Sequence, residues 1–148
     1  MQNKNLRVTA SRIGASPKKL IRSDLYTSNG YWLVTNSIQH KTVKDLEATM
    51  WNDTNEIKNE MMQKVIDKAV EGSLVELTDK GNAKIGSEYI RALLENDAQA
   101  AIVNYFYLAM FYDSGLSLSF KQEGGNNLAP VIVYAGYDFV GLIMPMIE

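Results

Sequence analysis

The pattern of apolar and polar positions predicts a helical region in the middle of the chain. Over residues 42–70, apolar side chains recur at every third or fourth position, which is the spacing of one helix face. The series comprises Val43, Leu46, Met50, Ile57, Met61, Val65 and Ala69. Thr42 with Asp45, and Asp53 with Glu56, resemble capping boxes, so we predict one helix or two with a break near WNDTN. We expect the helical region to end at Gly72.

Before this region, the pattern changes to short runs that favour strands. In LYTSNGYWLVTN, Asn29 and Gly30 separate two such runs, and this dipeptide is the strongest short-range signal for a β-hairpin. We therefore predict a hairpin centred on these two residues. Residues 5–22 stay ambiguous, because NLRVTASRI is typical of a strand and GASPKKLIR of a turn that opens a short helix.

The second half of the chain predicts a helix followed by a β-meander. SLVEL reads as a strand and DKGN as a turn, and residues 83–96 read as a strand leading into a short helix capped by Ser87. Four later apolar runs are separated by turn signals at residues 113–115, 123–127 and 136–138. We therefore expect an α+β fold with antiparallel sheet and two or three helices, in a single domain over residues 1–148.

The last twenty residues, APVIVYAGYDFVGLIMPMIE, are among the most apolar of the chain. A segment this rich in Val, Ile, Met and aromatic residues buries enough surface to offset its ordering entropy, so we expect it to be packed. Pro145 has no N–H to donate, and a proline is tolerated in a sheet mainly where that donor would face solvent. We therefore predict an edge strand over residues 142–147.

Composition narrows the class of protein. With 46% hydrophobic residues, 22% charged residues and a net charge of -2, the chain resembles an average globular domain. The absence of cysteine excludes disulfides, thiolate zinc sites and cysteine nucleophiles, and fits a reducing cytosol. The chain has neither the apolar run of a signal peptide nor the stretch of about 20 apolar residues that spans a membrane. We expect a cytoplasmic protein that does not bind membranes.

Residues that could carry catalysis are scarce. The single histidine, His40, leaves only one candidate general base, and its position before the helical region is typical of a solvent-facing or helix-capping side chain. The glycines of EGGNN precede a strand and not a helix, so they do not form a phosphate-binding loop. We expect no enzyme activity, no catalytic residue, no cofactor and no metal site.

The charged and aromatic residues argue against tight binding of nucleic acid. Lysines spaced along the helical region are typical of a solvated helix face, and a mildly acidic chain is unsuited to tight phosphate binding. These are Lys41, Lys44, Lys58, Lys64 and Lys68. The aromatic group over residues 105–112 is typical of core side chains on alternating strand faces. Stacking of single-stranded bases on it would also require a basic groove, and Lys121 is its only nearby cation.

Several stretches carry a resemblance to one family. SEYIRALLEN resembles a helix of the bacterial sliding clamp, the β subunit of the replicative polymerase, and APVIV resembles a clamp strand. GLIMPMIE resembles the clamp C-terminus, which often ends on Met-Pro-Met, and TSNGYWLV is similar in character to a clamp hairpin. The resemblance covers about half the chain. Ile147 and Glu148 depart from the usual ending, and Tyr31 and Trp32 replace smaller or polar residues.

The resemblance implies a function. In clamps, the hairpin and the C-terminal segment line a hydrophobic pocket that takes short linear peptides from partner proteins. It implies a peptide-binding site made of Gly30, Trp32, Leu33, Met144, Pro145 and Met146. It also implies that the five lysines face double-stranded DNA. A clamp subunit carries three such domains and closes a ring of six, so encirclement of DNA by this chain requires a homo-oligomer.

Two functions from different classes therefore stay open. The first is a non-enzymatic accessory protein of DNA replication or repair, related to a phage or mobile-element clamp. The second is a small phage-type inhibitor or interaction module that binds a protein partner and no DNA.

Overall fold

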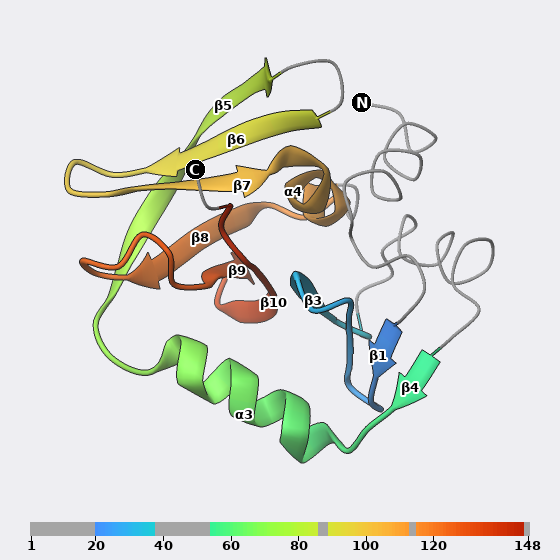
Figure 1. Ribbon diagram of the computed structural model, residues 1–148. Helices are drawn as coiled ribbons and strands as arrows, with labels where there is room; N and C mark the ends of the chain where they lie inside the picture. The colour runs from blue at the N-terminus through green and yellow to red at the C-terminus, as the bar shows by residue number, and fades with distance from the viewer. Residues whose placement is uncertain (1–19, 38–53, 86–88, 113–114, 147–148) are drawn as a thin grey trace.

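The computed structural model describes residues 20–37, 54–85, 89–112 and 115–146 (Figure 1). These residues form a mixed α+β fold with one large sheet and two helices. The elements are β1 (Leu20–Arg22), β2 (Tyr26–Ser28), β3 (Trp32–Thr35), β4 (Thr54–Glu56), α3 (Asn59–Val70), β5 (Leu74–Ile85), β6 (Tyr89–Glu95), β7 (Ala100–Asn104), α4 (Tyr105–Tyr112), β8 (Leu118–Glu123), β9 (Val131–Ala135) and β10 (Asp138–Ile143).

Antiparallel pairings join nine of the ten strands in the described residues. The order across the sheet is β4-β1-β2-β3-β10-β9-β8-β5-β6-β7, and only β4 joins its neighbour β1 in parallel. Consecutive strands β8, β9 and β10 form a meander, which confirms the prediction for the last three of the four apolar runs, whereas the first run forms β7 and α4. The α+β class and the antiparallel sheet are therefore confirmed at this level.

Strand β5 connects two parts of the sheet. Its residues 74–77 pair with β8, and its residues 78–85 pair with β6, so β5 runs up one side of the molecule (Figure 1). The predicted turn at DKGN is wrong. The pairing instead shifts between Asp79 and Asn82, where Gly81 takes a φ of 106°, and the strand continues past this bulge.

The hairpin centred on Asn29 and Gly30 is confirmed. β2 and β3 pair with Ser28 opposite Leu33, and Gly30 takes a φ of 94°, which residues other than glycine rarely adopt. The side-chain Oδ1 of Asn29 accepts hydrogen bonds from the backbone N–H groups of Tyr31 and Trp32, at 2.8 and 3.1 Å. The sequence of the turn thus fixes its own geometry.

The helical prediction over residues 42–70 is confirmed in its last part only. α3 ends at Val70, and Gly72 follows with a φ of 87°. Residues 42–53 lie outside the described part of the chain. The predicted capping role of Glu56 is wrong, because residues 54–56 form β4 and pair with β1. β1 also shows that residues 20–22 are strand and not helix.

The predicted helix within residues 83–96 is wrong. β5 continues to Ile85, and β6 covers most of SEYIRALLEN. β6 pairs on one side with β5 and on the other with β7, and its alternate residues Ala92 and Leu94 are buried. The sheet contacts override the helix propensity of Ala, Leu and Glu. The stretch that resembled a clamp helix therefore has a different secondary structure here.

The aromatic run over residues 105–112 forms helix α4 instead of a strand. Its side chains are apolar on all sides, which is typical of a helix enclosed by protein. Leu108, Met110 and Phe111 are almost completely buried. The prediction that this run contributes to the core is confirmed, while the predicted alternation of strand faces is wrong.

The sheet separates two hydrophobic clusters. On one face, α3 packs through Met62 and Ile66 onto Leu33 and other residues of the sheet. On the other face, α4, β6 and β7 enclose a larger cluster that includes Trp32 (Figure 1). Both faces of β3 are thus covered. No helix of the described residues is long and apolar enough to cross a membrane.

Candidate peptide-binding site

The hairpin and the C-terminal segment, far apart in sequence, lie side by side in the structure. β10 pairs with β3 so that Leu142 lies opposite Leu33 and Ile143 opposite Trp32. Beyond the last strand pair, the backbone N–H of Met144 donates to the carbonyl oxygen of Tyr31 at 2.9 Å. The turn of the hairpin and the chain after β10 therefore form one surface.

The prediction of an edge strand over residues 142–147 is wrong. Leu142 and Ile143 belong to β10, which is flanked by β3 and β9 and so lies inside the sheet. Pro145 lies just after the strand, where the sheet requires no N–H from it. Met146 then donates its backbone N–H to the carbonyl oxygen of Ile102 in β7, at 2.7 Å. The last described residues thus bridge the turn of the hairpin and β7.

Two of the predicted site residues are core residues. Trp32 is 2% exposed and Leu33 is 4% exposed, and they belong to the clusters on opposite faces of the sheet. Their side chains cannot contact a peptide on the surface. This corrects the expectation that they line the pocket, and the reason is that α3 covers one face of β3 while α4 covers the other.

Exposed side chains at the same place come from neighbouring residues. Tyr31 is 50% exposed and Met144 is 39% exposed, Gly30 lies at the surface, and Pro145 and Met146 are half-buried. We call these five residues the tail patch. Sequence reasoning treated Tyr31 only as a departure from the clamp pattern. Tyr31 lies inside the predicted turn, where a side chain does not have to pack on either face of the sheet, and this position could have identified it as an exposed residue.

The tail patch rests on a fixed base. The Tyr31 ring stacks on the ring of Tyr107 in α4, with centroids 6.5 Å apart and an angle of 16° between the planes. Burial raises the pKa of Tyr107 to about 12, although the neighbouring Asn29 side chain lowers it in part. Tyr107 is therefore neutral at physiological pH. The turn and this stack together hold the exposed Tyr31 side chain in place.

The predicted DNA-facing lysines fall into two groups. Lys58, Lys64 and Lys68 are exposed at the start of α3 and along it. Lys41 and Lys44 lie outside the described residues. The same helix also carries exposed Glu60 and Asp67, so its surface is not uniformly basic.

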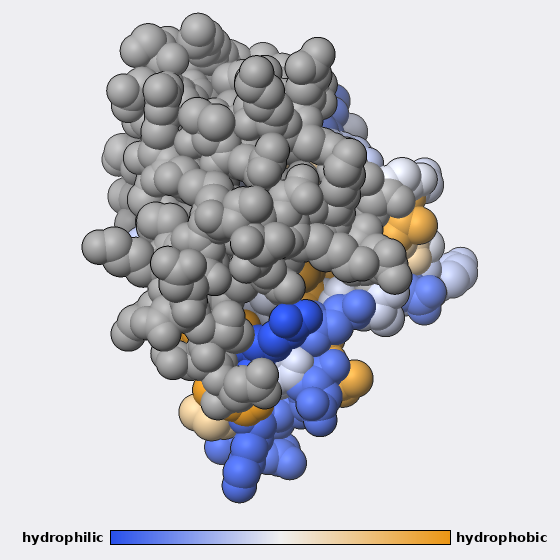
Figure 2. Space-filling view, turned by 90° about the vertical axis from the view of Figure 1, so that its right-hand side faces the viewer, coloured by the Kyte–Doolittle hydropathy of each residue, from blue (hydrophilic) through white to orange (hydrophobic). Residues whose placement is uncertain are grey.

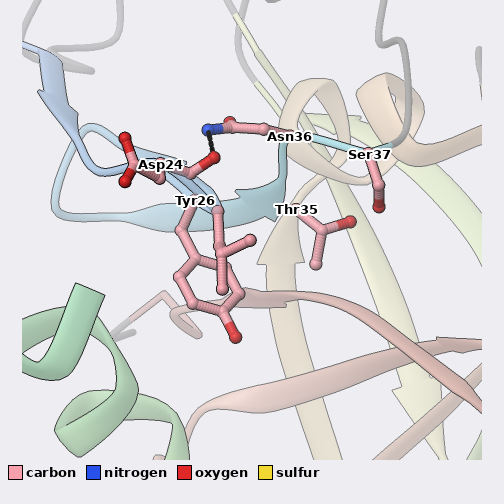
Figure 3. A pocket seen from close by; sticks show the side chains of 6 residues that line it. Asp24, Tyr26, Thr35, Asn36 and Ser37 are labelled. Carbon is pink, nitrogen blue, oxygen red and sulfur yellow. Dashed lines mark hydrogen bonds between the residues drawn. The ribbon is translucent and has the colours of Figure 1, made fainter.

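A pocket of about 390 Å³ lies between the β1–β2 turn and the end of β3. Asp24, Leu25, Tyr26, Thr35, Asn36 and Ser37 line it (Figure 3). Two of its polar side chains, Tyr26 and Asn36, are hydrogen-bonded within the fold, whereas the buried Oγ1 of Thr35 has no hydrogen-bond partner. Asn36 donates through Nδ2 to the carbonyl oxygens of Ser23 and Asp24, and the Tyr26 hydroxyl donates to Oε1 of Gln63. The residues lining the pocket include one carboxylate, so they offer no acid–base pair.

The described residues also contain no group of three or more His, Cys, Asp or Glu side chains that could hold a metal ion. Comparisons with models of protein families, with curated proteins and with solved structures found no match for this chain. A function therefore has to be argued from the surfaces of the protein itself.

Proposed function

We propose that this protein is a non-enzymatic interaction module that binds a short apolar segment of a partner protein at the tail patch. One observation carries the proposal. The backbone hydrogen bond from Met144 to the Tyr31 carbonyl brings together two residues that each have an exposed side chain and that lie more than a hundred residues apart in the sequence.

The chemistry of the tail patch suits an apolar ligand. It contains one tyrosine, two methionines and a proline, and none of its residues is charged. Tyrosine is enriched among residues that dominate binding energy, and methionine adapts to varied apolar shapes. Because the turn and the Tyr107 ring already order Tyr31, binding loses little side-chain entropy.

The size of the tail patch favours a short segment over a folded domain. Four apolar side chains provide much less contact surface than the roughly 800 Å² per partner of a stable complex between two folded proteins. A linear segment with one or two apolar anchors fits this surface. We expect moderate affinity as a result.

A peptide library displayed on phage, selected against the whole chain, tests the proposal. The affinity of each selected peptide is then measured by fluorescence polarisation with the unmodified protein and with Tyr31→Ala and Met144→Asp. Matched controls are Tyr137→Ala and Leu128→Asp, because Tyr137 and Leu128 are also exposed but lie outside the tail patch.

We expect apolar peptides whose dissociation constant rises at least about tenfold with each tail-patch variant, which corresponds to 1.4 kcal/mol, and stays constant with both controls. Selection of no peptide would refute the proposal. The same holds for peptides whose affinity falls equally with the control variants.

A clamp-like function on DNA is a second candidate, supported by the exposed Lys58, Lys64 and Lys68 on one helix. It requires several copies of the chain in a ring. Light scattering over a concentration series is the test: a discrete multimer of about six copies, with salt-dependent binding of duplex DNA, supports it. A monomer at all concentrations excludes the homomeric ring.

A further inference from the structure

We propose a second interaction surface on α3, which docks an acidic protein segment with apolar anchors. Its residues are Met61 and Val65 with the surrounding Lys58, Lys64 and Lys68, and we call this set the α3 flank. It goes beyond the tail patch and does not depend on peptide binding there.

Met61 and Val65 are exposed although the helix has a separate buried face. α3 packs onto the sheet through Met62, Ile66 and Ala69, whereas Met61 is 56% and Val65 54% exposed. Residues four apart lie one above the other on a helix, so these two side chains form one continuous apolar strip. The strip lies beside the core-facing side and contributes little to the core.

Cations border the apolar strip of α3. Lys64 and Lys68 lie three and seven positions after Met61, so helical periodicity places both next to the strip, and Lys58 is the N-cap residue three positions before Met61. Glu60 and Asp67 are seven apart and share the other side of the helix, and Lys64, four positions from Glu60 and three from Asp67, lies between these acids and the strip.

On the acidic side of α3, Asp67 takes part in a hydrogen-bond chain that reaches the sheet. Gln63 lies between Glu60 and Asp67 on that side, and its Nε2 donates to Oδ1 of Asp67 at 2.9 Å. The hydroxyl of Tyr26 in β2 donates to Oε1 of the same glutamine at 2.8 Å. The α3 flank is distinguished from this side by its two exposed apolar side chains, Met61 and Val65.

At the lower end of the molecule, around α3 and the β1–β2 turn, hydrophobic residues lie directly among hydrophilic ones (Figure 2). An apolar strip edged by cations fits a segment with the complementary arrangement, in which apolar anchors alternate with Asp or Glu. Such a partner would bury Met61 and Val65 under its apolar anchors and, in the same binding mode, form ion pairs between its carboxylates and the lysines.

Other occupants fit less well. A second copy bound symmetrically through α3 would bring lysines against lysines, which repel. Duplex DNA would place phosphates against Met61 and Val65, which cannot hydrogen-bond them, so docking of an acidic segment here and the clamp-like candidate on the same lysines exclude each other. A membrane-bound helix inserts its main apolar face, whereas that face of α3 is packed on the sheet.

The test uses the whole chain and a phage-displayed peptide library, selected first on the unmodified protein and then counter-selected on the double variant Met61→Ser with Val65→Ser. Both residues are exposed, so this variant should fold, which a thermal melt checks. A second variant, Lys64→Glu with Lys68→Glu, reverses the charge. Glu60→Gln is the matched control on the acidic side.

We expect acidic peptides with apolar anchors to be enriched. Their dissociation constant should rise about tenfold or more with either double variant, rise with salt from 50 to 200 mM, and stay constant with Glu60→Gln. Enrichment of peptides that are not acidic, or affinity insensitive to the double variants, overturns the proposal. Binding of duplex DNA or of phosphatidylserine vesicles through the same residues, with no acidic peptide enriched, also overturns it.

The two surfaces are tested separately. Tyr31→Ala should leave binding of the acidic peptides unchanged, and the α3 variants should leave binding of the apolar tail-patch peptides unchanged. Failure of one peptide class with its own variants therefore rejects one surface and not the other.

Discussion

The adjacent residues Tyr31 and Trp32 should respond in opposite ways to replacement by alanine. Trp32 is 2% exposed in the cluster between the sheet and α4. A buried tryptophan removes roughly 200 Å² from water, which at about 25 cal/mol per Å² is about 5 kcal/mol, and measured Trp→Ala changes cost about 3–5 kcal/mol. We expect Trp32→Ala to lower the free energy of unfolding by about 4 kcal/mol.

Tyr31→Ala should cost much less, because half of the side chain is already in water. The main loss is the stack on Tyr107, worth about 1 kcal/mol. The change should instead weaken peptide binding. A core residue and a surface residue at consecutive positions thus provide an internal control for each other.

Urea unfolding followed by far-UV circular dichroism measures both changes, since this signal does not depend on tryptophan fluorescence. If Trp32→Ala leaves too little stability to measure, Trp32→Phe should still show a smaller loss, of about 1–2 kcal/mol. A loss below about 1 kcal/mol for Trp32→Ala would refute the core assignment. Equal losses for Trp32→Ala and Tyr31→Ala would contradict it as well.

Three further changes test the fold. Gly141→Ala should lower the free energy of unfolding in urea by at least about 3 kcal/mol, because an added Cβ overlaps a backbone carbonyl of β3 and the Phe111 ring. A loss below about 1 kcal/mol would contradict this packing. Gln122→Leu should lower the free energy of unfolding by about 1–3 kcal/mol, because it removes the donor Nε2 of the fully buried Gln122, which bonds the Ala129 carbonyl. Unchanged stability would argue against that hydrogen bond. The pKa of Tyr107 is raised from 10 to about 12, so between these pH values the folded protein keeps the hydroxyl proton while the unfolded chain loses it. The free energy of unfolding should therefore fall as the pH rises from 10 to 12. An equally steep fall in the Tyr107→Phe variant would reject this cause.

Local signals in the sequence predicted the elements that local interactions determine. The Asn29-Gly30 turn satisfies its own hydrogen bonds, and the end of α3 at Gly72 uses a positive φ that glycine readily adopts. The meander was predictable for the same reason, because turn residues separate strand-favouring runs at residues 123–127 and 136–138. These features require no knowledge of distant residues.

Elements that depend on distant contacts were predicted wrongly. Leu94 and its neighbours favour a helix locally, but they form β6 because β5 and β7 pair with them on both sides. The run that forms α4 is apolar throughout, so it carries no periodicity from which a helix could be distinguished from a strand.

The sequence predicted that the hairpin and the C-terminal segment meet, but not which of their side chains are exposed. The hairpin and the C-terminal segment do meet, but Trp32, Leu33 and Val34 are all buried because both faces of β3 are covered. Alternation along a strand identifies an exposed face only when one face of the sheet is open. Tyr31 is exposed because it lies in the turn, beyond this constraint.

Methyl NMR of the methionines, recorded while a selected apolar peptide is added, tests binding at the tail patch most directly. Of the seven methionines, Met144 and Met146 belong to the tail patch, Met62 and Met110 are buried, and Met61 lies on the α3 flank. We expect the signals of Met144 and Met146 to shift with added peptide while those of Met62, Met110 and Met61 stay constant. Shifts confined to Met61, or no shift at Met144 and Met146 at saturating peptide, would contradict binding at the tail patch.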